Sequence, residues 1–135
     1  MKERFRLLMF GLLFFNLVSR AQTPTQGKSV ASGKVIYEQN CLSCHQADAS
    51  GVPHLAPSLI GSEYVNGDKT RLIKIILNGL QGVVIKGKSF GNPMPSFDSL
   101  SDQEIAALLT FVRANFSNTS GFVKVEEVTA ARGGK

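Results

Sequence analysis

Five consecutive residues carry the clearest chemical signal in the sequence: Cys41-Leu42-Ser43-Cys44-His45. The chain has two cysteines, and both belong to this C-x-x-C-H pattern. The pattern is typical of sites where a c-type haem is attached. Two thiols on one turn can add to the two vinyl groups of haem, and the adjacent histidine then lies under the iron. We therefore predict one covalent haem c, with Cys41 and Cys44 as thioether donors and His45 as the proximal iron ligand.

Two other interpretations of the cysteines have less support. A structural zinc site would need four ligands in tetrahedral geometry, drawn from Cys41, Cys44, His45 and His54. The adjacent Cys44 and His45 can hardly both point at an ion that Cys41 also binds, and a second ligand pair at the usual spacing is missing. A redox-active or structural disulfide of the thioredoxin kind would sit in a βαβ pattern, which this sequence lacks.

Met94 is the candidate ligand for the other face of the iron. It lies between two prolines, which fix φ near about −65° and would hold a thioether in place with little loss of entropy. A lone methionine often fills a gap in a core, but a filler does not need a rigid backbone. His54 is the alternative ligand. It follows His45 by nine residues, on the proximal side of a tethered ring, so we expect an exposed loop histidine instead.

Residues 1–21 have the layout of a cleaved secretory signal peptide. Three basic residues precede a run of twelve mostly apolar residues, LLMFGLLFFNLV, and small residues occupy positions −3 and −1 of a cleavage site before Gln22. An uncleaved membrane anchor is the alternative. However, crossing a bilayer takes about 20 apolar residues, and Asn16 interrupts a run that is already shorter. We therefore predict a periplasmic or otherwise exported protein.

Removal of this segment changes the charge of the protein. The full chain has 15 Lys+Arg and 10 Asp+Glu, a net charge of +5, whereas the 114 residues after the cleavage site have 11 and 9, a net charge of +2. It also leaves Met94 as the only methionine. Nucleic-acid-binding domains are usually strongly basic with a clustered patch. We therefore expect no nucleic-acid partner.

The mature sequence predicts an all-α domain over residues 32–117, with three to five helices around the haem. A first helix is expected from Gly33 to about Asn40, capped by Ser32. Asp68 precedes an amphipathic helix, and Ser101 and Glu104 form a capping box before another. The expected buried faces of these two helices are Leu72, Ile75, Ile76 and Leu80, and Ile105, Leu108, Leu109, Val112 and Phe116.

The remaining segments contribute little core. Residues 22–31 are predicted to be a flexible N-terminal segment, and residues 83–90 a small hairpin around Lys86-Gly87. Residues 118–135 are predicted to be a C-terminal extension in which 126–132 could form one or two helical turns that fray. A chain of this size buries only about 65% of its unfolded surface, so a cofactor is expected to fill the middle.

Four elements in order resemble class I mono-haem cytochrome c over about residues 30–117. The first is the spacing Gly33-x3-Tyr37-x3-Cys41 that leads into the haem motif. The others are Ala56-Pro57-Ser58-Leu59-Ile60-Gly61, similar to the family's Pro-x-Leu-x-Gly loop; Met94-Pro95-x-Phe97, similar to its axial-methionine loop; and Leu108-Leu109-Thr110-Phe111, similar to its C-terminal helix. Together the four elements are much more specific than the haem motif alone.

The resemblance implies particular contacts. The Pro57 carbonyl is expected to accept a hydrogen bond from Nδ1 of His45, which would fix the ring's tautomer and orientation. The first and last helices are expected to cross at Gly33, so that Gly33 and Tyr37 meet Leu108 and Phe111.

The resemblance also implies electron transfer by a carrier rather than catalysis by an enzyme. The partners expected are a redox protein donor and acceptor that dock transiently at the haem edge, with Lys86 and Lys88 as candidate steering charges. The chain lacks tryptophan and a lysine-rich ring, and its insert before the methionine loop is similar to bacterial domains that serve membrane-bound dehydrogenases and oxidases. The alternatives are a haem subunit or relay of such a complex, and a ligand sensor or peroxidase in which Met94 is displaced.

Overall fold

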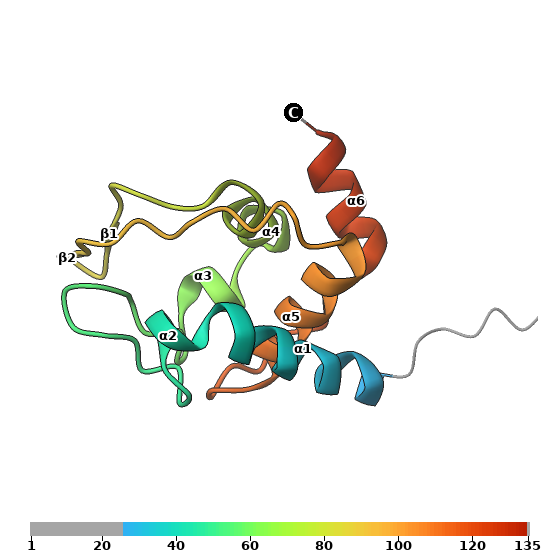
Figure 1. Cartoon of the computed structure of the whole chain (residues 1–135), viewed down its shortest axis with the longest axis horizontal. Coiled ribbons are helices and arrows are strands. Elements are labelled where there is room, and N and C mark those ends of the chain that lie inside the picture. Colours follow the sequence, from blue (N-terminus) through green and yellow to red (C-terminus); the bar gives the residue numbers. More distant parts are fainter. Residues whose placement is uncertain (1–25, 135) are drawn as a thin grey trace, which may run out of the picture.

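The computed structural model describes residues 26–134, which are mainly helical (Figure 1). The signal peptide predicted for residues 1–21 lies outside the described residues. The described elements are α1 (Gln26–Asn40), α2 (Leu42–His45), α3 (Glu63–Asn66), α4 (Lys69–Asn78), β1 (Val84–Ile85), β2 (Lys88–Ser89), α5 (Asp102–Ala114) and α6 (Val125–Gly133). The all-α fold class is confirmed. The helices exceed the expected three to five because α2 and α3 are single turns that no sequence pattern predicted.

Helices α1 and α5 form the centre of the fold, and they cross at Gly33. A Cβ atom on Gly33 would collide with the Ala107 carbonyl oxygen and would lie 2.7 Å from Cβ of Phe111. The Tyr37 ring packs 5.7 Å from the Phe111 ring and 5.3 Å from the Phe116 ring, measured between centroids. The predicted crossing is therefore present. An added Cβ on Gly33 would meet Ala107 and Phe111, which lie one helical turn apart on the same face of α5.

Two of the three capping signals read from the sequence are present. The third, Ser32, lies inside α1 instead of at its start, and its hydroxyl donates to the Ser29 carbonyl at 3.0 Å. The Ser101 hydroxyl accepts a hydrogen bond from the Glu104 amide, and a Glu104 carboxylate oxygen accepts one from the Ser101 amide at 2.8 Å. Asp68 accepts a hydrogen bond from the Arg71 amide at 2.7 Å and so caps α4. In the hairpin, Lys86 and Gly87 both have positive φ, at 50° and 74°. Two such residues match the twist of a two-residue turn, which confirms the predicted hairpin.

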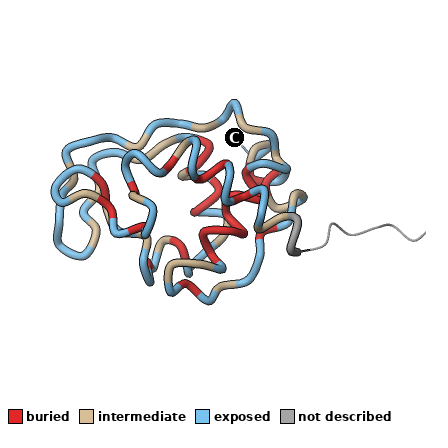
Figure 2. Tube along the Cα trace, turned by 60° about the horizontal axis from the view of Figure 1, so that its bottom comes forward, coloured by how far each residue is buried: buried red, intermediate tan, exposed pale blue. Residues whose placement is uncertain are grey.

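The buried face of α4 differs from the prediction. Leu72 and Ile76 are buried as expected, but they are joined by Ile73 and Leu77. Ile75 and Leu80 are only half-buried, and both line an apolar cavity next to this core. Figure 2 shows the same division: buried residues gather where the helices pack, and the loops on the other side are exposed.

The two ends of the described chain are more ordered than the sequence predicted. Helix α1 begins at Gln26 rather than Gly33, so part of the segment expected to be flexible is helical, and Val30 packs against the hydrophobic core. The short helix considered for the C-terminal extension is present as α6. It is docked on α4 and α5 instead of fraying, because Val128 is fully buried there and polar side chains tie it down.

Two buried polar side chains hold the segment 59–67, which contains α3 and leads into α4. Arg113 is 4% exposed and donates hydrogen bonds to the carbonyl oxygens of Val65, Gly67 and Gly121. Asn118 donates to the carbonyl oxygens of Leu59 and Val112, at 3.1 and 3.0 Å. These side chains satisfy carbonyls that no helix or strand pairs. They join residues 59–67 to the end of α5.

We expect Gly33→Ala to destabilise the holoprotein by about 1–3 kcal/mol, because a methyl group placed against backbone forces the two helices apart. The matched control is Gly121→Ala, where an added Cβ meets no atom within 4 Å. Chemical denaturation followed by circular dichroism measures both free energies of unfolding. Equal stabilities for the two variants would contradict the close crossing.

We expect the docking of α6 to weaken in acid. The hydrogen bonds from Thr129 and Arg132 lower the pKa of the Asp102 carboxyl. A carboxyl whose pKa is lowered by folding stabilises the folded state fully above its unfolded pKa of about 4, and that contribution is lost as the pH falls through the lowered value. Hydrogen exchange of the α6 amides from pH 6 to pH 3 measures the effect. Asp102→Asn should reduce the pH dependence, and the part that remains belongs to Glu127, whose pKa is also lowered in the folded state. Protection of α6 that stays constant in the wild type would contradict the expectation.

Candidate functional site

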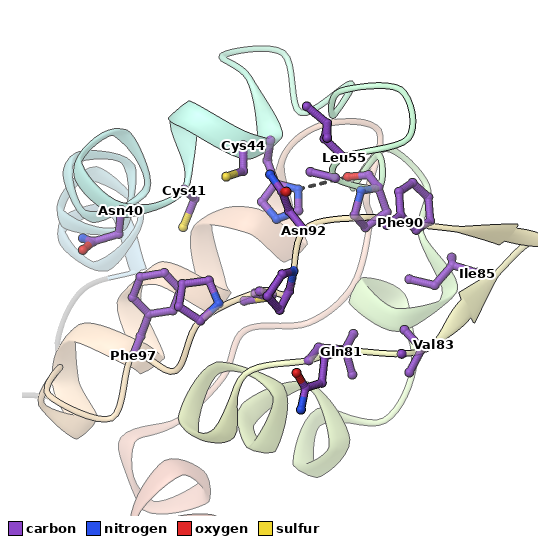
Figure 3. Close-up of a pocket in the computed structure, with 18 residues that line it drawn as sticks. Asn40, Cys41, Cys44, Leu55, Gln81, Val83, Ile85, Phe90, Asn92 and Phe97 are labelled. Carbon is purple, nitrogen blue, oxygen red and sulfur yellow. Dashed lines mark hydrogen bonds between the residues drawn. The ribbon is translucent and has the colours of Figure 1, made fainter.

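An apolar cavity opens between the junction of α1 and α2 on one side and the segment 80–97 on the other (Figure 3). It holds about 740 Å³ of empty space, its open mouth included, and adjoins a second hollow of about 660 Å³ that reaches α4 and α5. Six residues line both hollows, which makes them two parts of one site: Cys41, His45, Pro57, Leu80, Ile85 and Met94. The predicted ligands and attachment residues therefore meet at one cavity.

The haem motif is folded into a single tight turn. The Cys41 amide donates to the Tyr37 carbonyl at 2.8 Å, which continues α1 into the motif, and the His45 amide donates to the Cys41 carbonyl at 2.8 Å. Both cysteines are free thiols on the cavity wall, Cys41 buried and Cys44 exposed. Figure 3 shows them on one side of the cavity, with Gln81 and Val83 on the other.

The Cys41 thiol lies in an environment that disfavours its charged form. Burial, and then the neighbouring Cys44, raise the pKa of Cys41 to about 11. This apolar environment favours a neutral thiol or thioether over a thiolate. Within residues 26–134, no three His, Cys, Asp or Glu side chains come close enough together to hold a metal ion.

His45 is buried, with 8% of its surface exposed, and a backbone carbonyl orients its ring. Its Nδ1 lies 3.0 Å from the carbonyl oxygen of Pro57, the contact that the sequence resemblance implied (dashed line in Figure 3). A carbonyl oxygen can only accept, so Nδ1 carries the proton and Nε2 keeps its lone pair. Burial lowers the pKa of His45, against a smaller opposing effect of the Pro57 hydrogen bond. The ring is therefore neutral near pH 7, the form that binds a metal.

Gly51 makes the close return of the Pro57 loop possible, and the sequence analysis did not single it out. Its φ is +74°, and an added Cβ would lie 2.5 Å from the Ala56 carbonyl oxygen and 2.6 Å from that of Pro57. Its amide donates to the His45 carbonyl at 3.0 Å. A glycine six residues after the predicted haem-ligating histidine was the available signal, but its meaning depends on a return of the chain that only the structure reveals.

Met94 is half-buried and held by backbone pairing as well as by its flanking prolines. Its amide and carbonyl exchange hydrogen bonds with Leu80 at 2.9 and 3.0 Å. Gly79 has φ +75°, and a Cβ atom added to it would lie 2.5 Å from the Met94 carbonyl oxygen. Glycine therefore allows the chain to approach Met94 closely here. The end of α4 therefore positions the loop that carries the thioether.

His54, the alternative ligand, is placed elsewhere. Its side chain is exposed and is not part of the cavity lining. Its backbone has φ 63°, and its carbonyl oxygen accepts a hydrogen bond from the Gly91 amide at 2.8 Å. This residue therefore ties the loop before Pro57 to the end of the hairpin.

Comparison with known proteins agrees with this geometry. The sequence model of the cytochrome c family matches residues 30–115, more than half of the chain. The chain belongs to the cytochrome c family. Its cofactor is haem c, bound covalently. The site fits this group, since an apolar cavity presents two thiols and a neutral imidazole in one turn, and a thioether from a separate loop.

Three relatives illustrate the range of the family. Cytochrome c-552 of Thermus thermophilus is 40% identical over 87 residues, which cover 61% of this chain and 66% of the relative. The cytochrome c subunit of a quinone-dependent alcohol dehydrogenase from Gluconobacter oxydans (strain 621H) is 32% identical over 106 residues, 75% of this chain and 22% of that subunit. Subunit CcoP of a cbb3-type cytochrome c oxidase from Azospirillum brasilense is 30% identical over 103 residues, 71% of this chain and 32% of that subunit.

The match therefore spans less than two thirds of the length of these relatives, and only a small part of the larger ones. Among residues 26–134, no helix combines the length and the apolar character needed to cross a bilayer.

The double variant Cys41→Ala/Cys44→Ala is expected to lose covalently bound haem, because no other thiol can form a thioether link. Each single variant should weaken attachment. Haem staining after a denaturing gel measures the covalent fraction, and Ser43→Ala, which changes the residue between the two thiols, is the control. Haem that stays bound to the denatured double variant would refute the attachment sites.

Proposed function

We propose that the protein is an exported one-electron carrier whose haem c is attached through Cys41 and Cys44 and ligated by His45 and Met94. The observation that carries the proposal is that His45 and Met94, from two separate segments, line both parts of the same apolar cavity. The haem supplies an iron that takes up and releases a single electron.

The protein's residues set the conditions for this exchange. Pro57 orients His45 and keeps its Nε2 available, which strengthens the proximal side of the site. A Met94 thioether on the distal side favours ferrous iron and raises the potential relative to other ligand sets. Apolar side chains around the ligands, among them Leu80 and Ile85, exclude water. Two protein ligands leave no position for a substrate, which supports a carrier rather than an enzyme.

The mouth of the cavity is a suitable contact area for redox proteins. Leu55 lines the cavity and is 44% exposed, and Val84 on the neighbouring hairpin is 63% exposed. Lys86 and Lys88 on the same hairpin are exposed and carry positive charge. A small area that combines apolar contact with a few charges is typical of transient redox encounters. We propose that the electron donor and acceptor dock here.

A second candidate function is favoured by the names of the relatives. Several are cytochrome subunits of dehydrogenases, and one is a subunit of an oxidase. In this alternative the domain is a haem subunit or relay of such a complex, and it passes electrons without diffusing away. Purification of the native protein distinguishes the free carrier from the relay subunit. A carrier is recovered alone, whereas a relay subunit is recovered with its dehydrogenase or oxidase.

Met94→Ala tests the proposed ligation. Removal of the sulfur should abolish the weak far-red absorption band of ferric thioether-ligated haem, lower the reduction potential, and let imidazole bind to ferric iron and CO to ferrous iron. The haem should stay attached, because the thioethers and His45 are unchanged. Visible spectra and a redox titration measure these effects.

Asn92→Ala is the matched control, because Asn92 lies in the same loop and lines the cavity but has no soft ligand atom. A wild-type protein without the band, or a Met94→Ala protein that keeps it, would refute Met94 as a ligand. CO binding by the wild type would instead favour a sensor or peroxidase, with His54→Ala as the next variant.

A further inference from the structure

Helix α6 has no contact with the cavity and lies beyond the part of the chain that matches the family. Figure 1 shows it at the opposite end of the molecule from the hairpin. It is nevertheless firmly docked. Val128 is fully buried, and Glu127 pairs with Lys69 at the start of α4, with Nζ 3.0 and 3.2 Å from its two carboxylate oxygens.

Arg132, near the end of α6, makes a second attachment of a different kind. Its Nε lies 2.7 Å from the Asp102 carboxylate, and its two terminal nitrogens donate to the carbonyl oxygens of Asp98 and Leu100, at 2.8 and 2.7 Å. One planar guanidinium therefore binds a single stretch of five residues, 98–102. Thr129 donates to the other oxygen of the same carboxylate at 2.6 Å. Lysine cannot reproduce this arrangement, because its donors radiate from a single nitrogen.

The stretch held by Arg132 is the connection between Met94 and α5. Next to it, the Phe97 amide donates to the Ile76 carbonyl at 2.8 Å, and the Ser96 hydroxyl donates to the Leu77 carbonyl at 2.7 Å. The Asp98 amide in turn donates to the Ser96 hydroxyl at 3.2 Å. The methionine loop is therefore held by α4 along residues 94–97 and by α6 from residue 98 onward.

We propose that Arg132 is a positioning residue for the Met94 ligand: by clamping residues 98–102, it keeps the thioether at the iron. The proposal rests on the proposed ligation by His45 and Met94. A ligand on a loop is in equilibrium between bound and detached states, and detachment requires the loop to gain freedom. Release of the 98–102 end gives the loop that freedom, so the detached fraction rises.

The test is the affinity of the ferric holoprotein for imidazole, followed in the visible spectrum. An added ligand binds only molecules whose Met94 is detached, so its apparent affinity is proportional to that fraction. Arg132→Ala removes three hydrogen bonds, one of them to a carboxylate, and should raise the apparent affinity about tenfold. Arg132→Lys keeps the charge but loses the planar arrangement of donors, and should raise the apparent imidazole affinity by a smaller factor.

Lys69→Met is the matched control. It removes the ion pair through which Glu127 holds α6 to α4, and the hydrogen bonds of Lys69 go to Glu127 instead of the segment 94–102. Its imidazole affinity should stay close to that of the wild type. An equal rise for Lys69→Met and Arg132→Ala would mean that loosening α6 in general is responsible, and would overturn the assignment to Arg132.

A second measurement does not depend on imidazole. Hydrogen exchange of the Phe97 amide should be faster in Arg132→Ala than in Lys69→Met, because only the former frees the adjoining segment. If Arg132→Ala does not fold, both measurements are made on Arg132→Lys instead.

The two hypotheses fail differently. If the wild type has the thioether band and the Arg132 variants bind imidazole as it does, the clamp is refuted and the ligation stands. If the wild type lacks the band, or Met94→Ala keeps it, the ligation is refuted and the clamp with it.

Discussion

Gly33 lets the backbone of α1 lie directly against α5, because any side chain there would collide with the Ala107 carbonyl. This contact sets the position of everything that follows along α1. The helix ends at Asn40, and the haem motif continues from it through the hydrogen bond from Cys41 to Tyr37. The rings of Tyr37, Phe111 and Phe116 fill the space beside the crossing. The direction in which His45 faces the cavity therefore depends on two helices that are far apart in the sequence.

The rest of the site is built from loops, which have to satisfy their polar backbone groups without regular secondary structure. Side chains do part of this work. Arg113 and Asn118 bind carbonyls of residues 59–67, and Ser96 binds a carbonyl at the end of α4. Arg132 does the same for the segment before α5. Loops held in this way can carry ligands at fixed positions, which a freely moving loop could not do.

The cofactor belongs to the core as much as to the site. Ile75 and Leu80 are half-buried and line the cavity, so their apolar surface is available to cover the haem. The helices alone supply a limited core for a domain of this size. The covalently attached haem stays on the unfolded chain as well, so it stabilises the fold through the apolar contacts that it makes only in the folded state.

Much of the chemistry could be predicted from the sequence, because its signals are local. The haem motif spans five residues, the capping box of α5 joins residues three apart, and the hairpin turn depends on two neighbours. Each is a short-range interaction whose partners can be identified from their spacing in the sequence. The Pro57 contact with His45 was reached only through family resemblance, since nothing in the spacing alone requires it.

The interactions between distant residues were decided only by the tertiary structure. The docking of α6 depends on the complete burial of Val128 and on the pairing of Arg132 with Asp102, thirty residues away, and a weakly amphipathic segment gives no sign of either. The early start of α1 has the same origin, because Val30 packs on a core assembled from other elements. Likewise, the prolines indicate that Met94 is held rigidly, but its pairing with Leu80 determines the position of Met94 in the fold. Sequence patterns record which groups can interact, whereas burial and long-range contacts determine which of them meet.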